Sequence, residues 1–393
     1  MTGREFWMAV HRYSGLAILV FLGFAALTGS LLVQMHPLDR WLNADLFAQE
    51  RAPTAPSVAP LVAAFVRTHP EFAVRSFPLT VAADARIPVK VEAGEGAAGV
   101  DQVFLDRTTG ALAGTRSTRA AFTRRGAAEL LHDVHYTLLM GTGGRWFMGA
   151  MALVWLIGNL VGVYLTLPER GAFWAQWKRS WRFSFKSVFA RQMLDFHRAS
   201  GLWLLLPLTL LALTSVCLNF FSEGYGPLVE RLVPERAQPL PASPATGPLD
   251  FPKAVAAARE VEQGLRGHWR PASVINDLNH GRIGVTLTES GTLSYDDLGP
   301  IYLYFEAASG RLVEVDDPYH GNANLAMYRW LYPVHSGHVA GVASEIAVFL
   351  LGLVVFAMCV TGIYLWWKKR PGRLRQRRRR KAGPRGRPEG SMT

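Results

Sequence analysis

Charged residues and cysteines are both scarce in this chain of 393 residues. Only 18% of the residues are charged and 50% are hydrophobic, which is too apolar for a soluble basic protein. The two cysteines, Cys217 and Cys359, lie in apolar stretches, and no CxxC or CxxCH motif occurs. These absences exclude a disulfide framework and a covalently attached c-type haem. No GxGxxG follows a predicted strand, so a nucleotide cofactor would have to sit on a partner protein.

Four apolar stretches reach the length of about 20 residues that is needed to cross the hydrocarbon core of a membrane. They cover residues 14–35, 146–167, 202–221 and 342–367. The sequence therefore predicts an α-helical membrane protein with a four-helix transmembrane bundle. The predicted domains are the N-terminus with the first span (1–35), an external module (36–145), the second span (146–167), a basic and aromatic connection (168–201), the third span (202–221), a second external module (222–341), the fourth span (342–367) and a polybasic tail (368–393).

The net charge of +12 is concentrated beside these spans, in residues 170–198 and 368–387. Lys and Arg next to membrane spans mark the cytoplasmic side, so this distribution predicts the lipid bilayer as a partner and no nucleic acid. We expect a multi-pass protein of the bacterial inner membrane with both termini in the cytoplasm. The two long loops then face the periplasm, because long loops translocate largely regardless of charge.

An internal repeat divides the chain into two halves. The hexapeptide HRYSGL at 11–16 returns as HRASGL at 197–202, with five of six residues identical. The segments DVH at 133–135 and GVYL at 162–165 return as PVH and GIYL at a constant offset of 200 residues. Each half has the order span, external module, span, so the sequence predicts an internal duplication.

Four of the eleven histidines occupy equivalent places in this repeat. His11 and His197 form one pair, and His135 and His335 form the other. Two imidazoles that face each other about 4 Å apart through one iron are the axial ligands of a six-coordinate b-type haem. The repeat therefore predicts two b haems, one toward each face of the membrane. A lone histidine at a helix end is more often an interfacial anchor, but four equivalent ionisable residues near the hydrocarbon indicate a function. Two histidines alone would be an incomplete zinc or copper site.

Other candidate site residues flank these four. Arg12 and Arg198 follow the first pair and are candidates for contacts to haem propionates, although both also fit the excess of cytoplasmic positive charge. His132 and His338 lie three residues from His135 and His335 and are alternate ligands.

The two external modules have similar predicted structure. Residues 60–69 and 251–266 have the pattern of short amphipathic helices. Alternating strands follow each helix, at 87–91 and 103–106 in the first module and at 284–288 and 301–306 in the second. Each loop is thus predicted to fold as a compact α+β module.

With these motifs the chain resembles the PepSY-associated transmembrane family and, within it, the inner-membrane di-haem ferric-siderophore reductases. The resemblance covers nearly the whole chain, through HRxSGL at 11 and 197, HYTLLMG at 135–141, PVHSG at 333–337 and TGIYLWW at 361–367. It implies PepSY-like external modules, two haem b cofactors and reduction of ferric siderophore in the periplasm.

A haem with two histidine ligands has no open coordination site, which favours outer-sphere electron transfer. We expect an electron from a cytoplasmic or quinol donor to reach a ferric siderophore or other ferric chelate, which then releases ferrous iron from its hard oxygen ligands. Two alternatives stay open at this point: a b-type cytochrome subunit of another membrane oxidoreductase, and a non-enzymatic, membrane-anchored PepSY binding module. A transporter would need broken helices or ionisable groups at the bilayer midplane, and the four stretches predict few of either.

Overall fold

The computed structural model describes residues 2–381 except 52–55, 95–96, 236–239, 242 and 244–245. Of the predicted polybasic tail (368–393), residues 382–393 lie outside the described part. The chain divides into two units by its contacts. The first unit consists of Met1–Leu27, Ala150–Val216 and Leu350–Thr393, and the second of Thr28–Gly149 and Cys217–Phe349.

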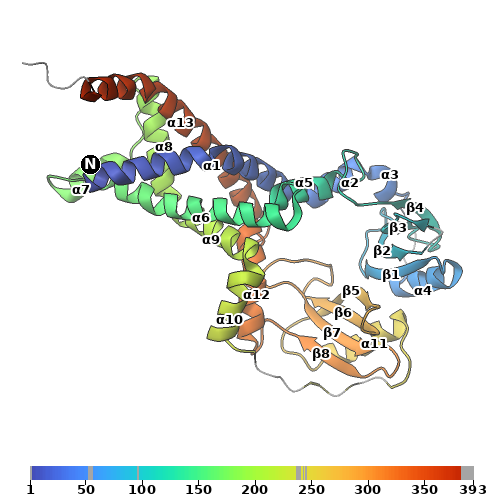
Figure 1. Ribbon diagram of the computed structural model, residues 1–393. Coiled ribbons are helices and arrows are strands. Elements are labelled where there is room, and N and C mark those ends of the chain that lie inside the picture. Colours follow the sequence, from blue (N-terminus) through green and yellow to red (C-terminus); the bar gives the residue numbers. More distant parts are fainter. Residues whose placement is uncertain are drawn as a thin grey trace, which may run out of the picture. The chain divides into compact units, whose positions relative to one another are not determined.

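Three helices among the described residues are long and apolar enough to cross a membrane (Figure 1). They are α1 (Gly3–Val33), α6 (Gly141–Thr166) and the segment Val342–Gly372 of α13 (Val342–Lys381). The third predicted span is not one straight helix. Instead, α8 (Phe189–Trp203) and α9 (Leu205–Asn219) meet with a bend of 73°. The spans therefore number three, or four if the bent pair crosses as one.

Pro207 gives a physical reason for the bend between α8 and α9. A proline has no backbone N–H, and in a continuous helix its ring would clash with the carbonyl of the residue four positions earlier, here Trp203. The helix accordingly ends at Trp203 and begins again at Leu205. The expectation of few broken helices, which counted against a transporter, is corrected by this break.

The first unit is held together by an apolar cluster and by a short connection. Leu208 of α9 packs with Leu351 and Val355 of α13, and Leu22 of α1 packs against this cluster. The basic and aromatic connection forms the short helices α7 (Phe173–Trp177) and η2 (Lys178–Trp181).

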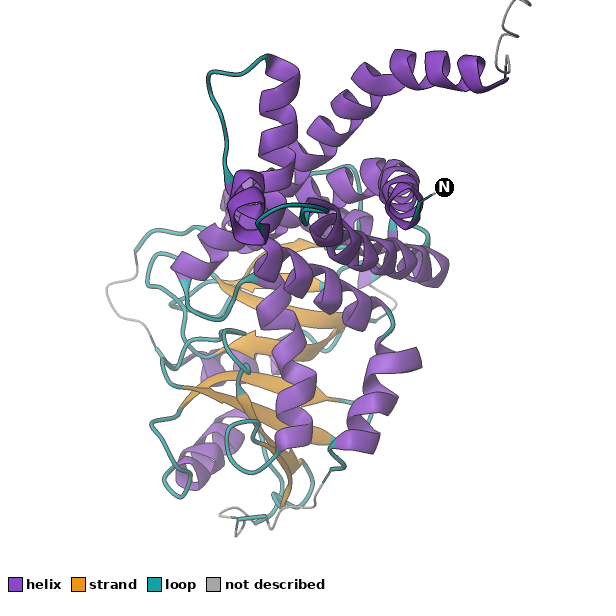
Figure 2. Cartoon of the chain, turned by 90° about the vertical axis from the view of Figure 1, so that its left-hand side faces the viewer, coloured by secondary structure: helices purple, strands orange, loops and turns teal. Residues whose placement is uncertain are grey.

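One antiparallel sheet of eight strands forms the centre of the second unit (Figure 2). The strand order is β4-β3-β2-β1-β5-β6-β7-β8, so each half of the sheet is a four-stranded meander. The strands are β1 (Phe72–Pro78), β2 (Ile87–Ala93), β3 (Gln102–Leu105), β4 (Leu112–Arg116), β5 (Arg270–Asp277), β6 (Arg282–Thr288), β7 (Ile301–Glu306) and β8 (Leu312–Asp316). A helix precedes each meander, α4 (Val58–Thr68) in the first half and α11 (Phe251–Glu262) in the second. The two predicted helices and four named strands are confirmed.

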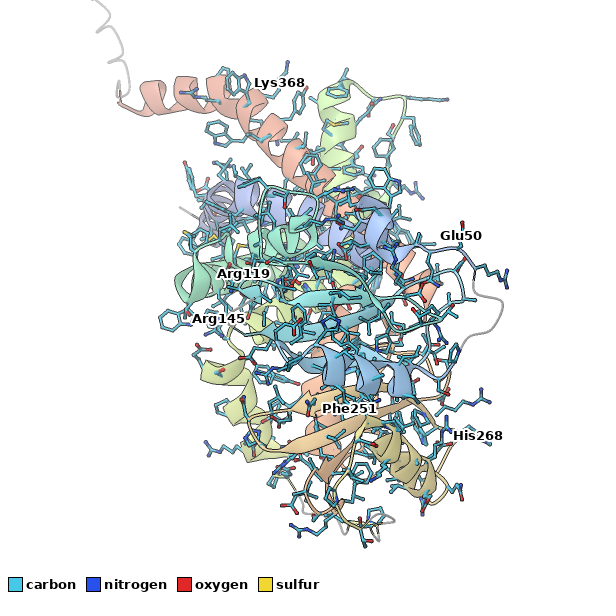
Figure 3. All side chains as sticks on the ribbon, turned by 90° about the vertical axis from the view of Figure 1, so that its right-hand side faces the viewer. Glu50, Arg119, Arg145, Phe251, His268 and Lys368 are labelled. Atoms are coloured by element: carbon cyan, nitrogen blue, oxygen red, sulfur yellow. The ribbon has the colours of Figure 1, made fainter. Side chains whose placement is uncertain are left out.

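The two halves of the sheet share one core instead of folding as two separate modules. Strands β1 and β5, absent from the predicted strands, pair with each other and place Phe77 opposite Val274. The helices α4 and α11 also contact each other, and the ring of Phe251, labelled in Figure 3, meets that of Phe77 at 5.2 Å. An unpaired edge strand presents a row of free N–H and C=O groups. The pairing of β1 with β5 satisfies these groups where the two meanders meet.

Short helices complete the second unit and carry three of the candidate histidines, His132, His135 and His335. These helices are α2 (Met35–Leu42), α3 (Ala44–Phe47), α5 (Ala127–Thr137), η3 (Phe221–Tyr225), α10 (Gly226–Leu232) and α12 (Ala323–Ser336). The hydroxyl of Tyr328 on α12 donates to the carbonyl of Gly226 on α10 at 3.2 Å, which fixes α12 against α10. The side chain of Asn322 caps α12 by accepting from the backbone N–H of Leu325.

Candidate functional site

The structure brings His11 and His197 together in the first unit, as the repeat predicts. His11 lies on α1 and His197 on α8, and their ring centroids are 6.4 Å apart with the ring planes at 75°. We name them the inner pair, after the predicted topology. The Nδ1 atom of His197 lies 3.2 Å from both the carbonyl oxygen of Met358 and Oγ1 of Thr361, on α13. The Nδ1 atom of His11 is buried and has no hydrogen-bond partner within the described part of the chain.

Two glycines of the repeat lie beside the inner pair. A Cβ atom on Gly162 of α6 would lie 3.4 Å from Cε1 of His11. A Cβ atom on Gly362 of α13 would lie 3.9 Å from Cε1 of His197. These glycines begin the repeated GVYL and GIYL segments, so equivalent positions of the repeat face equivalent histidines.

The second unit brings His135 of α5 and His335 of α12 together, and we name them the outer pair. Their ring centroids are also 6.4 Å apart, with the planes at 48°. Nδ1 of His135 lies 3.0 Å from Oγ1 of Thr28, and a Cβ atom on Gly29 would lie only 2.9 Å from Cε1 of His135. Burial lowers the pKa of His335 to about 4, so its imidazole is neutral at pH 7, the form that ligates metals.

The spacing of both pairs fits a metal between the two rings. An iron–nitrogen bond of about 2.0 Å, with each nitrogen about 1.1 Å from its ring centroid, places the centroids of two axial imidazoles about 6.2 Å apart. Both pairs measure 6.4 Å. His11, His197, His135 and His335 could therefore hold two iron centres, each with two histidine ligands.

The two candidate arginines differ in their surroundings. Arg198 donates to Oδ1 of Asp195 and to the carbonyl oxygen of Arg179, both at 2.9 Å. The Asp195 carboxylate is buried and also pairs with Arg191. Arg12 lies beside the ring of Tyr13, with the guanidinium carbon 6.0 Å from the ring centroid, and forms no salt bridge within the described residues. Of the two, Arg12 has the guanidinium available for an anionic group.

The two alternate histidines have partners other than the paired rings. His132 is exposed, and its Nδ1 lies 3.3 Å from a carboxylate oxygen of Asp133. His338 instead meets two carboxylates, those of Asp296 and Glu345, and the ligand atoms of these three residues all lie within 4.8 Å of one another. Neither carboxylate was a predicted site residue.

The sequence pattern contains a signal for Thr28 that the histidine repeat alone does not reveal. The tripeptide Ala-Leu-Thr at 26–28 returns at 212–214, at the same offset of 186 residues that relates His11 to His197. Gly29 has no counterpart of this kind, since a serine occupies position 215. Asp296 and Glu345 are 49 residues apart in the sequence, so only the folded chain brings them together.

These features define a membrane protein that carries paired histidines and an additional antiparallel sheet. The chain belongs to the family of the PepSY-associated TM region, whose model matches residues 8–369. A comparison with curated proteins gave no match.

Proposed function

We propose that this protein is a transmembrane ferric-chelate reductase of the bacterial inner membrane, in which the inner and outer pairs each hold one b haem. The haems, when bound, supply one-electron transfer from a cytoplasmic or quinol donor to a ferric siderophore in the periplasm. The observation that carries this proposal is the 6.4 Å spacing of two separate histidine pairs, in two different units.

The chain's own residues orient the proposed ligands. With Nε2 directed to a metal, Nδ1 carries the proton and donates a hydrogen bond that fixes the ring. Thr28 offers an acceptor to His135, and the Met358 carbonyl and Thr361 hydroxyl offer acceptors to His197. With both histidines of a pair as its ligands, a bound haem would have no coordination position left for oxygen, and the chemistry it would supply is outer-sphere electron transfer.

The proposed topology uses the bent pair α8 and α9 as the third of four spans and places both termini in the cytoplasm. The basic residues at 170–198 and 368–387 support this orientation. The equivalent positions of His11 and His197, and of Gly162 and Gly362, support a duplicated four-helix bundle. In this topology the sheet is periplasmic and would present the PepSY-like surface to the chelate.

Arg12 is the proposed partner of a haem propionate at the inner pair. Its guanidinium forms no salt bridge within the described residues, whereas Arg198 is engaged by Asp195. A planar guanidinium can donate two parallel hydrogen bonds to a carboxylate, which suits this role.

The first test is the absorption spectrum of the detergent-purified protein, oxidised and dithionite-reduced, with a pyridine haemochrome count. We expect two b haems per chain, and one haem fewer in His135→Ala and in His197→Ala. His132→Ala is the matched control, because His132 lies on the same helix as His135 but is exposed, and it should keep both haems. A colourless protein, expressed with ample haem supply, would favour the alternative of a membrane-anchored PepSY binding module.

The second test separates a reductase from a b-type cytochrome subunit of another oxidoreductase. The dithionite-reduced protein, freed of excess reductant, is mixed anaerobically with a ferric trihydroxamate chelate and a ferrous-specific dye. Reoxidation of the haem bands with formation of the ferrous dye complex is the result expected for a reductase. A reduced spectrum that persists unchanged would leave the cytochrome subunit as the better account.

A further inference from the structure

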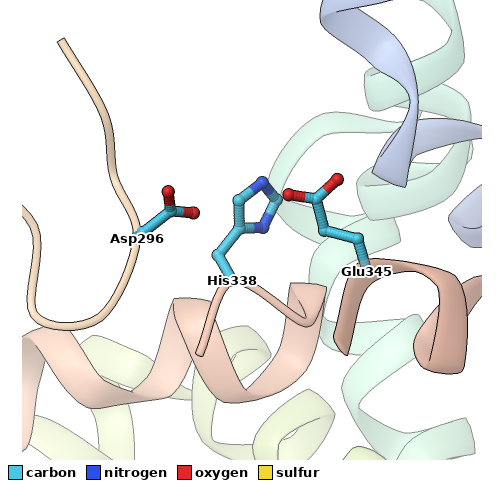
Figure 4. A group of neighbouring side chains, drawn as sticks. All are labelled: Asp296, His338 and Glu345. Carbon is cyan, nitrogen blue, oxygen red and sulfur yellow. The ribbon is translucent and has the colours of Figure 1, made fainter. Parts of the chain in front are cut away.

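His338, Asp296 and Glu345 form a cluster that the paired histidines do not explain. The three side chains come from separate segments: Asp296 from the loop between β6 and β7, His338 from the turn after α12, and Glu345 from the first turn of α13. All three are half-buried, and their ligand atoms lie within 4.8 Å of one another. Figure 4 shows both carboxyl groups close to the imidazole ring of His338, one on either side.

The backbone around His338 is built to hold this position. Gly337 ends α12 with a positive φ of 87°, and a Cβ atom there would lie 2.8 Å from the carbonyl oxygen of Ser344, so only glycine fits. The carbonyl of His338 accepts a hydrogen bond of 2.7 Å from the backbone N–H of Asp297. That bond ties the turn after α12 to the loop that carries Asp296.

The side-chain contacts leave a free ligand atom on His338 and on Asp296. Nδ1 of His338 lies 2.8 Å from Oγ of Ser336, and the ring stacks on Tyr332, so that among the described residues Nε2 is available for another ligand. The Ser294 hydroxyl donates to Oδ2 of Asp296 at 2.7 Å and leaves Oδ1.

The two carboxylates of the cluster carry charge that the described Lys and Arg side chains do not pair with. Neither Asp296 nor Glu345 forms a salt bridge with Lys or Arg in the part of the chain that the structure describes. Two carboxylates that converge on a neutral imidazole repel each other, and a bound cation removes that cost.

The donor set indicates which cation this is. Carboxylate oxygens alone suit Ca²⁺ and Mg²⁺, which bind oxygen ligands, whereas an imidazole nitrogen beside two carboxylates suits Fe²⁺, Mn²⁺ or Zn²⁺. Three protein ligands also leave coordination positions for water, so such an ion can exchange.

We propose that Asp296, His338 and Glu345 form a divalent transition-metal site, and that the Fe²⁺ released by chelate reduction is the ion it receives. The identity of the ion rests on the proposed reductase function, whereas the existence of the site does not. His338 follows His335 by three residues in the sequence, and the outer pair and the cluster belong to the same unit, which offers one nitrogen and two oxygen ligands to the ferrous ion.

The test measures Mn²⁺ binding to the full-length, detergent-purified protein, prepared without a histidine tag and freed of metals. Free Mn²⁺ is followed by its room-temperature electron paramagnetic resonance signal. We expect one Mn²⁺ per chain, displaced by Fe²⁺ under anaerobic conditions but not by an equal concentration of Ca²⁺. The dissociation constant should rise at least tenfold in Asp296→Asn and in Glu345→Gln, as about 10 to 100-fold losses are usual even for groups that only support a ligand.

The matched control is Asp297→Asn. Asp297 is the adjacent carboxylate, is exposed, and has a φ of 53°, a conformation that asparagine also adopts. It should bind Mn²⁺ as the wild type does. Equal Mn²⁺ binding in all three variants, or equal displacement by Ca²⁺, would overturn the metal site.

The outcomes also separate this inference from the proposed function. A red protein that reduces ferric chelate but binds Mn²⁺ equally in all variants would refute the metal site alone. A colourless protein whose Mn²⁺ binding is lost in Asp296→Asn and Glu345→Gln would support the metal site and refute its supply by chelate reduction.

Discussion

The inner and outer histidine pairs have the same spacing and different surroundings. Each pair places two ring centroids 6.4 Å apart. At the outer pair, a threonine hydroxyl lies 3.0 Å from Nδ1 of His135, and Gly29 lies close against the ring. At the inner pair, His197 has both a backbone carbonyl and a hydroxyl within reach, whereas Nδ1 of His11 has no partner among the described residues.

The difference indicates that the two proposed haem sites share a ligand set but are tuned separately. Hydrogen bonds to the distal nitrogen of an axial histidine raise its basicity and stabilise the oxidised metal. The close contact between the Gly29 backbone and His135 instead fixes the position of the imidazole ring, so a larger side chain at position 29 should displace it. Substitutions at these contacts should separate the two sites, with the largest effect expected at Gly29 of the outer pair and the smallest at Thr361 of the inner pair.

The largest effect is expected from Gly29→Val. A Cβ atom alone would lie 2.9 Å from Cε1 of His135, and the branched side chain of valine adds two further carbons at that position. His135 is then displaced from His335, so the pyridine haemochrome count should fall from two per chain to one, with the inner haem retained.

Two glycines serve as controls for this prediction. Gly143→Val introduces the same side chain where a Cβ atom would meet nothing within 4 Å, and Gly362→Ala places one at 3.9 Å from His197, an ordinary contact distance. Both variants should keep two haems. If Gly29→Val also keeps two haems, the close contact has no part in positioning His135.

The pairing of the histidines could be predicted because it depends on the repeat, and a repeat is visible in the sequence. The helices α4 and α11 and two strands of each meander could be predicted because their hydrophobic periodicity is local in the sequence. The pairing of β1 with β5 could not, because it joins strands about 200 residues apart in the sequence and depends on which edges meet in the folded chain. The hydropathy of residues 202–221 also does not reveal the bend between Trp203 and Leu205, because an average hydropathy does not register the missing N–H of Pro207.

The next effect concerns Arg198, which the sequence could not distinguish from Arg12. Arg198→Gln removes one of the two arginines that pair with the buried Asp195 carboxylate, and because Arg191 still pairs with it, the cost should stay below the roughly 3 kcal/mol of a fully broken buried pair. We expect a lower apparent Tm in detergent, restored in part by the double variant with Asp195→Asn. Haem content at the inner pair should fall only in proportion to the fraction of protein that is unfolded.

Arg12→Gln is the comparison variant for Arg198. It should leave the apparent Tm unchanged, because Arg12 forms no salt bridge within the described residues. Loss of a positive charge beside a haem propionate stabilises the oxidised state, so the midpoint potential of the inner haem should fall. An unchanged potential would show that Arg12 does not contact a propionate.

A smaller effect is expected at the outer pair from Thr28→Val, which keeps the shape of the side chain and removes the hydroxyl near His135. One neutral hydrogen bond is worth about 1 kcal/mol, or about 40 mV for a one-electron couple. Because the lost bond favoured the oxidised state, the midpoint potential of the outer haem should rise in a spectroelectrochemical titration. Ser30→Ala, on the same helix, removes a hydroxyl that donates to the carbonyl of Phe349 and should leave that potential in place.

The smallest effect is expected from Thr361→Val at the inner pair. Nδ1 of His197 lies at 3.2 Å from two acceptors, and the carbonyl of Met358 stays in place when the Thr361 hydroxyl is removed. The potential of the inner haem should therefore rise by less than half of the shift in Thr28→Val, or by under about 20 mV. A shift as large as that of Thr28→Val would identify the hydroxyl as the true acceptor. A small shift would mean that the main chain sets the basicity of His197, and side-chain substitutions would then tune the outer pair far more readily than the inner one.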